Sequence, residues 1–481
     1  MAKTRLLMKP VLLLLLCFCL LPIALGAEES IHARELREWK ARELSGWQGW
    51  QDPQNLPVAP LARSHRNTTH EVHGYHPYWM GNAYEDYDWD LLSTVAFFSL
   101  ELSSTGDISN NHGWPWTGLV ETAHDNGVRV LLTATMFLSW DLTVLLSSAS
   151  NRSNAISQLV SAVTEGGADG VNVDFEGVAW DQRSNYVLFL QDLRIALDAA
   201  LPNAYLSVAT PAVDWSDAYW YSAIASYSDH LMVMAYDFHY PGSSSTGPVA
   251  PLANWGTYNV TWSINDYLNK GVAASKLLLG VPYYGYLWSC ANGEPGAPTY
   301  GWGTAKTFAE AYPEALNYGL LWDGAGQTSW YRYNSGGWYQ CWFEDDRSLT
   351  FKYEFAINEN LAGIGIWALG YDGSRSELWT ALDDAFGTLA DAVPLSAQLK
   401  LEAWPNPFNP RTRIRVSREE AGPLNLVIHD LQGRSVQDLF HGQAGEVLEL
   451  DWQAENLPSG VYLLRGSAGG PLFSKKLLLL K

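Results

Sequence analysis

The segment Asp169 to Glu176 reads Asp-Gly-Val-Asn-Val-Asp-Phe-Glu and places one amide and two carboxylates in alternation with apolar residues. Successive side chains of a β-strand point to opposite faces, so Asn172, Asp174 and Glu176 share one face. Two carboxylates two positions apart on that face are close enough to change each other's pKa. A neighbouring carboxylate is one means by which a general acid obtains the raised pKa that it needs. The segment therefore predicts acid–base chemistry.

An edge strand with one solvated face would show the same alternation. The flanking residues argue against that interpretation, because 159–163 and 186–197 have the pattern of amphipathic helices. A strand between two helices belongs to a parallel sheet, which is buried on both faces. In such a place a polar face needs a functional reason.

A strand-then-helix rhythm continues along most of the chain. The predicted strands are 73–78, 94–102, 129–135, 170–175, 205–210, 230–236, 277–282 and 363–369. Helical patterns occupy most of the intervals, among them 119–126, 154–166 and 351–360. This succession is typical of an α/β fold of the (β/α)8 TIM-barrel type, here expected over residues 70–389.

The interval between the seventh and eighth predicted strands is too long for one helix. It contains Trp322 and the strand-like runs 330–333 and 338–343, so we expect a small α+β insertion at about 288–345. Cys290 and Cys341 lie in or beside it and would be the two cysteines of an exported chain, which favours one disulfide between them.

The two ends of the chain differ from the barrel. Residues 395–481 contain closely spaced turn signals and strand-like runs at 413–416, 424–429, 447–452, 461–465 and 473–480, which predict an immunoglobulin-like β-sandwich. Residues 1–26 have the basic start, apolar run and small residues of a signal peptide, and the apolar run is short for a membrane anchor. Residues 27–69 come between this peptide and the barrel, and 33–44 have a helical pattern. We expect this segment to be an N-terminal leader or a helix packed outside the main domain.

Composition narrows the class of ligand. The chain has 51 acidic and 30 basic residues and a formal charge of −21, which disfavours nucleic acid and anionic lipid as partners. Aromatic residues make up 13% of the chain, which fits either a carbohydrate ligand or a tryptophan-rich core. We see no histidine cluster for a metal and no glycine-rich phosphate loop, so no metal and no cofactor is expected.

In a barrel of this type, the active groups lie at the C-terminal ends of the strands. Those ends carry acids and aromatic residues that would converge on one mouth. The candidates are Tyr75, Asn172, Asp174, Glu176, Met234, Tyr236, Asp237, Tyr283, Tyr284 and Trp367.

The octet resembles the Asp-Gly-x-Asp-x-Asp-x-Glu motif of family 18 glycoside hydrolases, the chitinase-like enzymes. Met234 to Asp237 resembles that family's sixth strand, and Gly280 to Gly285 its seventh. Glu344 to Ser348 and Gly365 to Trp367 are similar to the run into its eighth strand. The resemblance covers about residues 70 to 387 and rests on several motifs in the family's order.

The resemblance implies a retaining mechanism assisted by the substrate, an exception to the two-carboxylate scheme. Glu176 would protonate the glycosidic oxygen, and the acetamido carbonyl of the substrate would be the nucleophile. Asp174 would hold the acetamido N–H and Tyr236 its oxygen, while Asp237 would line the same pocket. Trp367 would form the floor under the sugar. The remaining substrate-binding candidates are Tyr75, Asn172, Met234 and Tyr283.

Asn172 departs from the family pattern, which has aspartate there. An asparagine can donate a hydrogen bond to Asp174 but cannot take up its proton, so we expect an altered pH dependence with activity retained. The asparagine variant is similar to the members that act on spore cortex and other peptidoglycan. Chitin, peptidoglycan and N-glycan cores all stay open as substrates, as does a non-catalytic lectin with the same barrel.

The C-terminal region resembles the sorting domain of the type IX secretion system. The motifs are Pro405 to Pro410, His429 to Arg434, Ser459 to Tyr462 and Lys475 to Leu479. The resemblance implies a secreted or surface-attached protein that meets the secretion machinery. We expect a monomer.

Overall fold

The structure is a computed structural model that describes residues 29–46, 58, 61, 68–387, 399–418, 422–429, 435–467 and 472–481. The predicted signal peptide and part of the His429–Arg434 motif lie outside the described residues. Within the described ranges, no helix has both the length and the apolar character that crossing a bilayer requires.

The central element is a closed barrel of eight parallel strands. These are β1 (Glu71–Pro77), β2 (Thr94–Leu102), β4 (Arg129–Met136), β5 (Gly170–Phe175), β6 (Tyr205–Pro211), β7 (His230–Met234), β8 (Leu277–Pro282) and β14 (Gly363–Trp367). Their order is β1-β14-β8-β7-β6-β5-β4-β2, and pairing of β1 with β2 closes the ring. The short β3 (Ile108–Asn110) adds an antiparallel strand to β2. The predicted TIM barrel is therefore confirmed.

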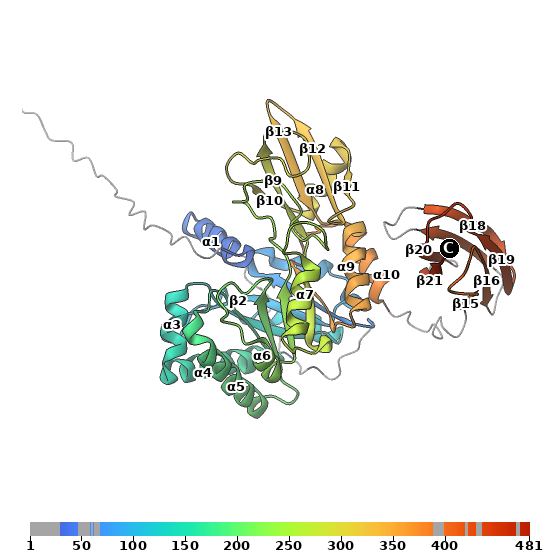
Figure 1. The fold of residues 1–481 in the computed structure, drawn as a ribbon. Coiled ribbons are helices and arrows are strands. Elements are labelled where there is room, and N and C mark those ends of the chain that lie inside the picture. The colour runs from blue at the N-terminus through green and yellow to red at the C-terminus, as the bar shows by residue number, and fades with distance from the viewer. Residues whose placement is uncertain are drawn as a thin grey trace, which may run out of the picture.

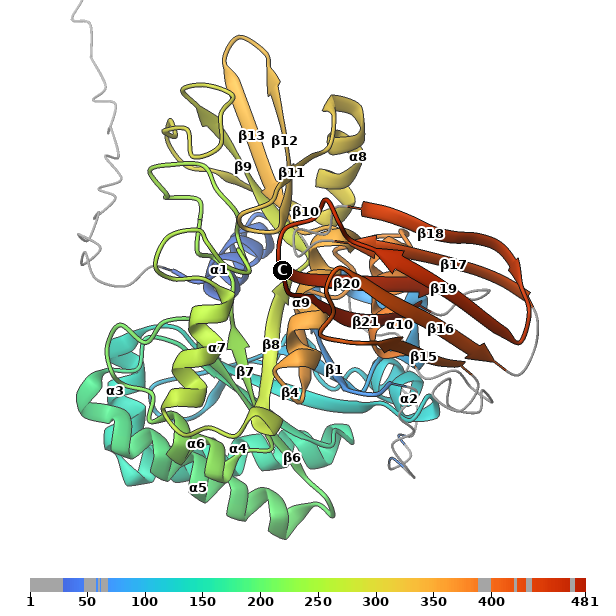
Figure 2. The ribbon, with the colours of Figure 1, turned by 45° about the vertical axis from the view of Figure 1, so that its right-hand side comes forward.

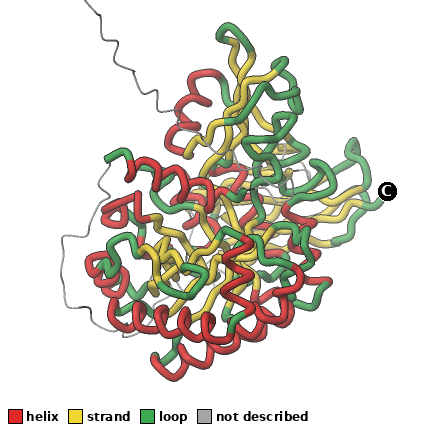
Figure 3. The backbone as a smooth tube through the Cα atoms, turned by 90° about the vertical axis from the view of Figure 1, so that its left-hand side faces the viewer, coloured by secondary structure: helices red, strands yellow, loops and turns green. Residues whose placement is uncertain are grey.

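Helices surround the barrel strands (Figure 3). They are α2 (Thr117–Asp125), α3 (Ser139–Ser147), α4 (Ala149–Gly166), α5 (Arg183–Ala200), α6 (Tyr221–Tyr227), α7 (Val260–Asn269), α9 (Asp346–Asn358) and α10 (Glu377–Phe386). Short 3-10 turns lie at Tyr78–Asp86, Trp89–Leu91, Trp180–Gln182 and Ala274–Lys276.

Strand β5 has the two faces that its alternation predicts. The ring of Phe175 stacks on Phe189 of α5 at a centroid distance of 5.2 Å, so the apolar face packs against the surrounding helices. Gly170 starts the strand, and a Cβ atom there would lie 1.9 Å from the carbonyl oxygen of Tyr205 on β6. Only glycine permits that close approach. Gly170 therefore lets β5, the strand that carries the acids, pack directly against β6.

The insertion between β8 and β14 is a five-stranded antiparallel sheet with one helix, as predicted in kind. It comprises β9 (Tyr284–Cys290), β10 (Thr304–Thr307), α8 (Phe308–Tyr318), β11 (Leu321–Asp323), β12 (Thr328–Asn334) and β13 (Trp338–Phe343), in the order β10-β9-β13-β12-β11. It begins with Tyr284, directly after the barrel strand, rather than near residue 288.

The predicted disulfide is wrong, since Cys290 and Cys341 are both buried free thiols. In the pairing of β9 with β13, Cys341 lies opposite Leu287 and Cys290 lies opposite Trp338. Opposed residues share a sheet face and neighbours alternate, so Cys341 and Cys290 point to opposite faces of the sheet. A disulfide needs Cβ atoms about 4 Å apart, which this register excludes.

The C-terminal region forms two antiparallel sheets with their own apolar core, as predicted for a β-sandwich. One sheet has the order β15-β16-β19 and the other β18-β17-β20-β21. The strands are β15 (Leu399–Trp404), β16 (Arg411–Arg418), β17 (Gly422–His429), β18 (Ser435–Ala444), β19 (Val447–Gln453), β20 (Gly460–Ser467) and β21 (Leu472–Leu479). The sequence pattern missed β15 and β18.

The leader contains helix α1 (Ile31–Leu44), capped by the Ser30 side chain, which accepts a hydrogen bond from the backbone N–H of Ala33. The helix itself was predicted, but its expected place outside the main domain is wrong. In Figures 1 and 2 α1 lies between the barrel and the inserted sheet, where Ser30, His32 and Arg34 contact barrel and insertion side chains. Sequence periodicity cannot show this, because the most deeply buried contacts use the N-terminal end of the helix rather than one of its sides.

Candidate active site

The two acids of the octet lie at the C-terminal end of β5. Asp174 is fully buried, and Glu176 follows the last strand residue. Burial and the neighbouring charge of Asp174 raise the pKa of Glu176 well above that of an ordinary glutamate. A raised pKa favours the protonated form that a general acid requires.

Tyr236 and Asp237 follow β7 and face the same end of the barrel. Asp237 has a φ of 59°, a left-handed conformation that is uncommon for residues other than glycine. Its Oδ1 accepts hydrogen bonds from the hydroxyls of Tyr284 and Tyr286, at 2.6 and 2.8 Å. Burial raises the pKa of the Asp237 carboxyl even so, because desolvation outweighs these bonds.

Trp367 ends β14 and is fully buried at the centre of the mouth. Its indole contacts Phe98 edge to face at 4.9 Å and Tyr75 at 5.5 Å between ring centroids. The Tyr75 hydroxyl donates to Oδ1 of Asn172 at 3.3 Å. Tyr75, Asn172 and Trp367 thus belong to one group of side chains with the octet acids.

Asn172 is placed differently from the expectation that it donates to Asp174. Its Oδ1 accepts from the hydroxyls of Tyr75 and Ser207, and its Nδ2 lies 3.5 Å from Oγ1 of Thr133. The amide therefore links the strands on either side of β5. This arrangement positions the strand and leaves Asp174 to other partners.

One predicted substrate-binding residue, Tyr283, points away from the group. The Tyr283 hydroxyl lies 3.3 Å from that of Tyr353 on α9, so its side chain points toward the helix layer. Tyr284, the next residue, points the opposite way and reaches Asp237 instead, as alternation requires. Met234 is buried at the end of β7 and ends the strand just before Tyr236.

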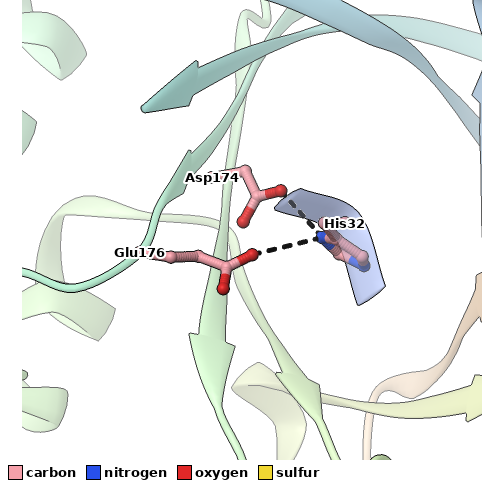
Figure 4. Close-up of side chains that lie close together, drawn as sticks. All are labelled: His32, Asp174 and Glu176. Carbon is pink, nitrogen blue, oxygen red and sulfur yellow. Dashed lines mark hydrogen bonds and ion pairs between the residues drawn. The ribbon is translucent and has the colours of Figure 1, made fainter. Parts of the chain in front are cut away.

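Helix α1 supplies site residues that the sequence did not reveal. His32 is fully buried, with Nδ1 at 2.8 Å from Oδ2 of Asp174 and Nε2 at 2.8 Å from the hydroxyl of Tyr236. Its ring stacks on Trp367 at a centroid distance of 3.7 Å. Figure 4 shows the imidazole facing the carboxylates of Asp174 and Glu176. Oε1 of Glu176 lies 3.8 Å from Nδ1 of the imidazole.

The neighbours of His32 contact the remaining groups. The Ser30 hydroxyl donates to Oε1 of Glu176 at 2.7 Å. Arg34 donates to the Tyr286 hydroxyl and lies 4.0 Å from Asp237. Glu35 accepts hydrogen bonds from Trp367 Nε1 at 2.9 Å and from the Tyr371 hydroxyl at 2.7 Å.

Ligand atoms of His32, Asp174 and Glu176 lie within 4.8 Å of one another, a set that could hold a metal ion. In the structure Nδ1 of His32 is hydrogen-bonded to Asp174, and the hydroxyl of Ser30 is hydrogen-bonded to Glu176. These contacts account for both the imidazole and the acid without an ion.

The family model described as glycosyl hydrolases family 18 matches residues 71–372, and that described as secretion system C-terminal sorting domain matches residues 402–480. The sorting domain indicates export, to the cell surface or beyond it.

Among similar proteins is human di-N-acetylchitobiase, 27% identical over 62% of this chain and 80% of its own. The cortical fragment-lytic enzyme of Bacillus subtilis (strain 168) is 24% identical over 51% of this chain, and the match spans 56% of that enzyme. A Cycas revoluta chitinase structure in complex with (GlcNAc)3 has a TM-score of 0.59, at 20% identity over 66% of this chain and 99% of its own. The last of these likenesses supports the fold.

Proposed function

Because the chain belongs to glycosyl hydrolases family 18, we propose that it hydrolyses β-1,4 bonds in polymers that contain N-acetylglucosamine, such as chitin or peptidoglycan. The reaction is a retaining one, in which the acetamido group of the substrate is the nucleophile. The observation that carries the proposal is the convergence of Asp174, Glu176 and Tyr236 above the indole of Trp367.

The position of His32 supports the assignment of roles. A planar group that stacks on Trp367 meets an acceptor, Asp174, on one side and a hydroxyl, Tyr236, on the other. An acetamido group offers an N–H and a carbonyl oxygen that match these two partners. Asp174 would hold the N–H, and Tyr236 would hold the oxygen that attacks the anomeric carbon.

The first step breaks the bond between that carbon and the glycosidic oxygen. Glu176 gives its proton to the leaving oxygen while the acetamido oxygen bonds to the anomeric carbon, forming an oxazolinium ion. The negative charge of Asp174 stabilises this cation. Water then attacks the same carbon, and Glu176 takes a proton from this water. The bond from the acetamido oxygen to the carbon breaks, which restores the acetamido group with net retention of configuration.

The test is hydrolysis of N-acetylglucosamine oligosaccharides and of purified peptidoglycan by the protein and by its Glu176→Gln variant. Product from either substrate that disappears in the variant establishes the enzyme and identifies the polymer. Both proteins are assayed after removal of α1, which occupies the barrel mouth. Tight sugar binding by both proteins without product would contradict the proposal and favour the lectin with the same barrel.

A further inference from the structure

The first turn of α1 is buried on every side. Ile31 and His32 are fully buried, and Ala33, Arg34 and Leu36 are at most 9% exposed. Consecutive helical residues point about 100° apart, so four buried residues in a row surround the helix axis. A helix that lies across a surface buries one stripe. This helix instead inserts its N-terminal end into the barrel mouth.

The inserted residues occupy the groups that the proposed reaction needs. With its proton on Nδ1, the His32 ring donates to Asp174 and accepts from Tyr236 at Nε2, as the acetamido group of a sugar would. The same ring covers Trp367, the surface on which the sugar would lie. Ser30 in turn holds the oxygen of Glu176 that would face the scissile bond.

The contacts continue outward along the helix. Lys40 pairs with Glu101 at 2.7 Å, and Trp39 stacks on Trp79 at a centroid distance of 5.8 Å. In the last turn Glu43 lies 3.8 Å from Nδ1 of the buried His112, and Leu44 beside it is 92% exposed. The helix therefore enters the barrel at its N-terminal end and leaves it at its C-terminal end.

We propose that residues 29–44 form an inhibitory segment, whose His32 fills the position of the N-acetyl sugar and prevents substrate binding until the segment leaves the mouth. The identity of the excluded sugar rests on the proposed function. The occupancy of the mouth rests on the contacts of Ser30, His32, Arg34 and Glu35.

Tethering makes such a segment effective. A short tether gives an effective concentration on the order of millimolar. A released peptide at about 100 nM would be roughly ten-thousand-fold more dilute. Separation from the barrel therefore removes the inhibition unless the segment binds very tightly.

The experiment inserts the recognition sequence of a site-specific protease between Ser45 and Gly46 of the full chain. Both residues are exposed, and among the described residues no atom beyond the chain neighbours of Gly46 lies within 4 Å of a Cβ atom built there, so the insertion has room. The Glu176→Gln background is used, so that sugar binding is measured without hydrolysis. Calorimetry with the N-acetylglucosamine tetramer compares uncut protein with cut protein freed of the peptide.

We expect the cut protein to bind the tetramer at least tenfold more tightly than the uncut protein. A synthetic peptide of residues 29–45 should displace the sugar. The His32→Ala peptide should compete at least tenfold less well, and the Glu38→Gln peptide, altered at an exposed residue of the same helix, should compete as the native one does.

Binding of the tetramer with equal, measurable affinity before and after cutting, or a peptide that binds without displacing sugar, would overturn the inference. So would loss of the folded state on release, measured by circular dichroism, because α1 would then be a structural part of the barrel. If neither form binds the tetramer while the cut protein still binds the peptide through His32, the segment is confirmed as the occupant of the mouth. In that case only the substrate assignment fails.

Discussion

His32 and Asp174 are 142 positions apart in the chain, yet their side chains meet in a buried contact of 2.8 Å. A carboxylate oxygen only accepts, so the imidazole nitrogen that faces Asp174 is the donor. The same carboxylate is the group we assign to the acetamido N–H of a substrate. Under this assignment one acceptor would serve two ligands that exclude each other.

Glu176→Gln should separate catalysis from binding. Loss of a general acid lowers the rate by about 10²–10⁴-fold, and we expect kcat of the cut protein to fall by that much. Glutamine keeps an oxygen that can accept from Ser30, so the peptide of residues 29–45 should still bind. The measurement is initial rates on N-acetylglucosamine oligosaccharides beside peptide calorimetry. A variant with full activity would remove Glu176 from the mechanism.

Asn172→Asp should add an ionisation to the pH profile. The side chain is fully buried two strand positions from Asp174, so a second carboxylate there would share a proton with Asp174. Oδ1 would still accept from Tyr75 and Ser207, which preserves the local packing. We expect kcat/KM of the cut variant to fall as the pH rises through a pKa that the native protein lacks.

The control for that profile is Ser207→Ala, which removes one hydrogen bond to Asn172 without adding a charge. It should change the rate at all pH values alike. Superimposable profiles for the native and Asn172→Asp proteins would show that position 172 does not couple to the acids.

Docking of α1 should weaken as the pH rises. Burial raises the pKa of Glu35 from 4.5 to about 7, against the opposing effects of Tyr371, Arg34 and Trp367 and with a small contribution from Glu38. The docked segment thus binds a proton that the free segment releases between pH 4.5 and 7. Affinity is highest below this window and falls through it by up to about tenfold per pH unit.

Calorimetry of native and Glu35→Gln peptides with cut Glu176→Gln protein measures this effect. Glutamine can accept the same two hydrogen bonds but does not titrate, so its affinity should fall less between pH 5 and 7. Other groups in the mouth act equally on both peptides, so the difference between them reports Glu35. Parallel curves would show that Glu35 is not protonated on docking.

The barrel could be predicted because each strand and helix carries its own periodic pattern. Alternation in the octet predicted Asp174 and Glu176 on one face, and the positions of Tyr236 and Trp367 at the C-terminal ends of their strands predicted that they share one end of the barrel. Tyr283 was predicted to face the site but points toward α9 instead. Two adjacent tyrosines match the same motif, and only the strand register decides which one faces Asp237. The pattern could not supply that choice because β8 and β9 meet at that point.

The docking of α1 could not be predicted, since no periodic signal marks a helix that inserts its end. The polar residues Ser30, His32, Arg34 and Glu35 are typical of a solvated helix when they are considered alone. Their partners lie in distant segments of the barrel and the insertion.

The state of the two cysteines can be tested chemically. Burial raises the pKa of Cys341 to about 12 and also raises that of Cys290, so neither thiol should react with a thiol reagent in the native protein. Denaturation without reductant should then expose two thiols in each chain that has lost its signal peptide. Reductant should leave the melting temperature unchanged. The pairing of β9 with β13 points Cys290 and Cys341 to opposite faces of the sheet, so no disulfide joins them. A chain with no titratable thiol after denaturation, or a melting temperature lowered by reductant, would mean that the two strands pair in a different register, with both cysteines on one face of the sheet.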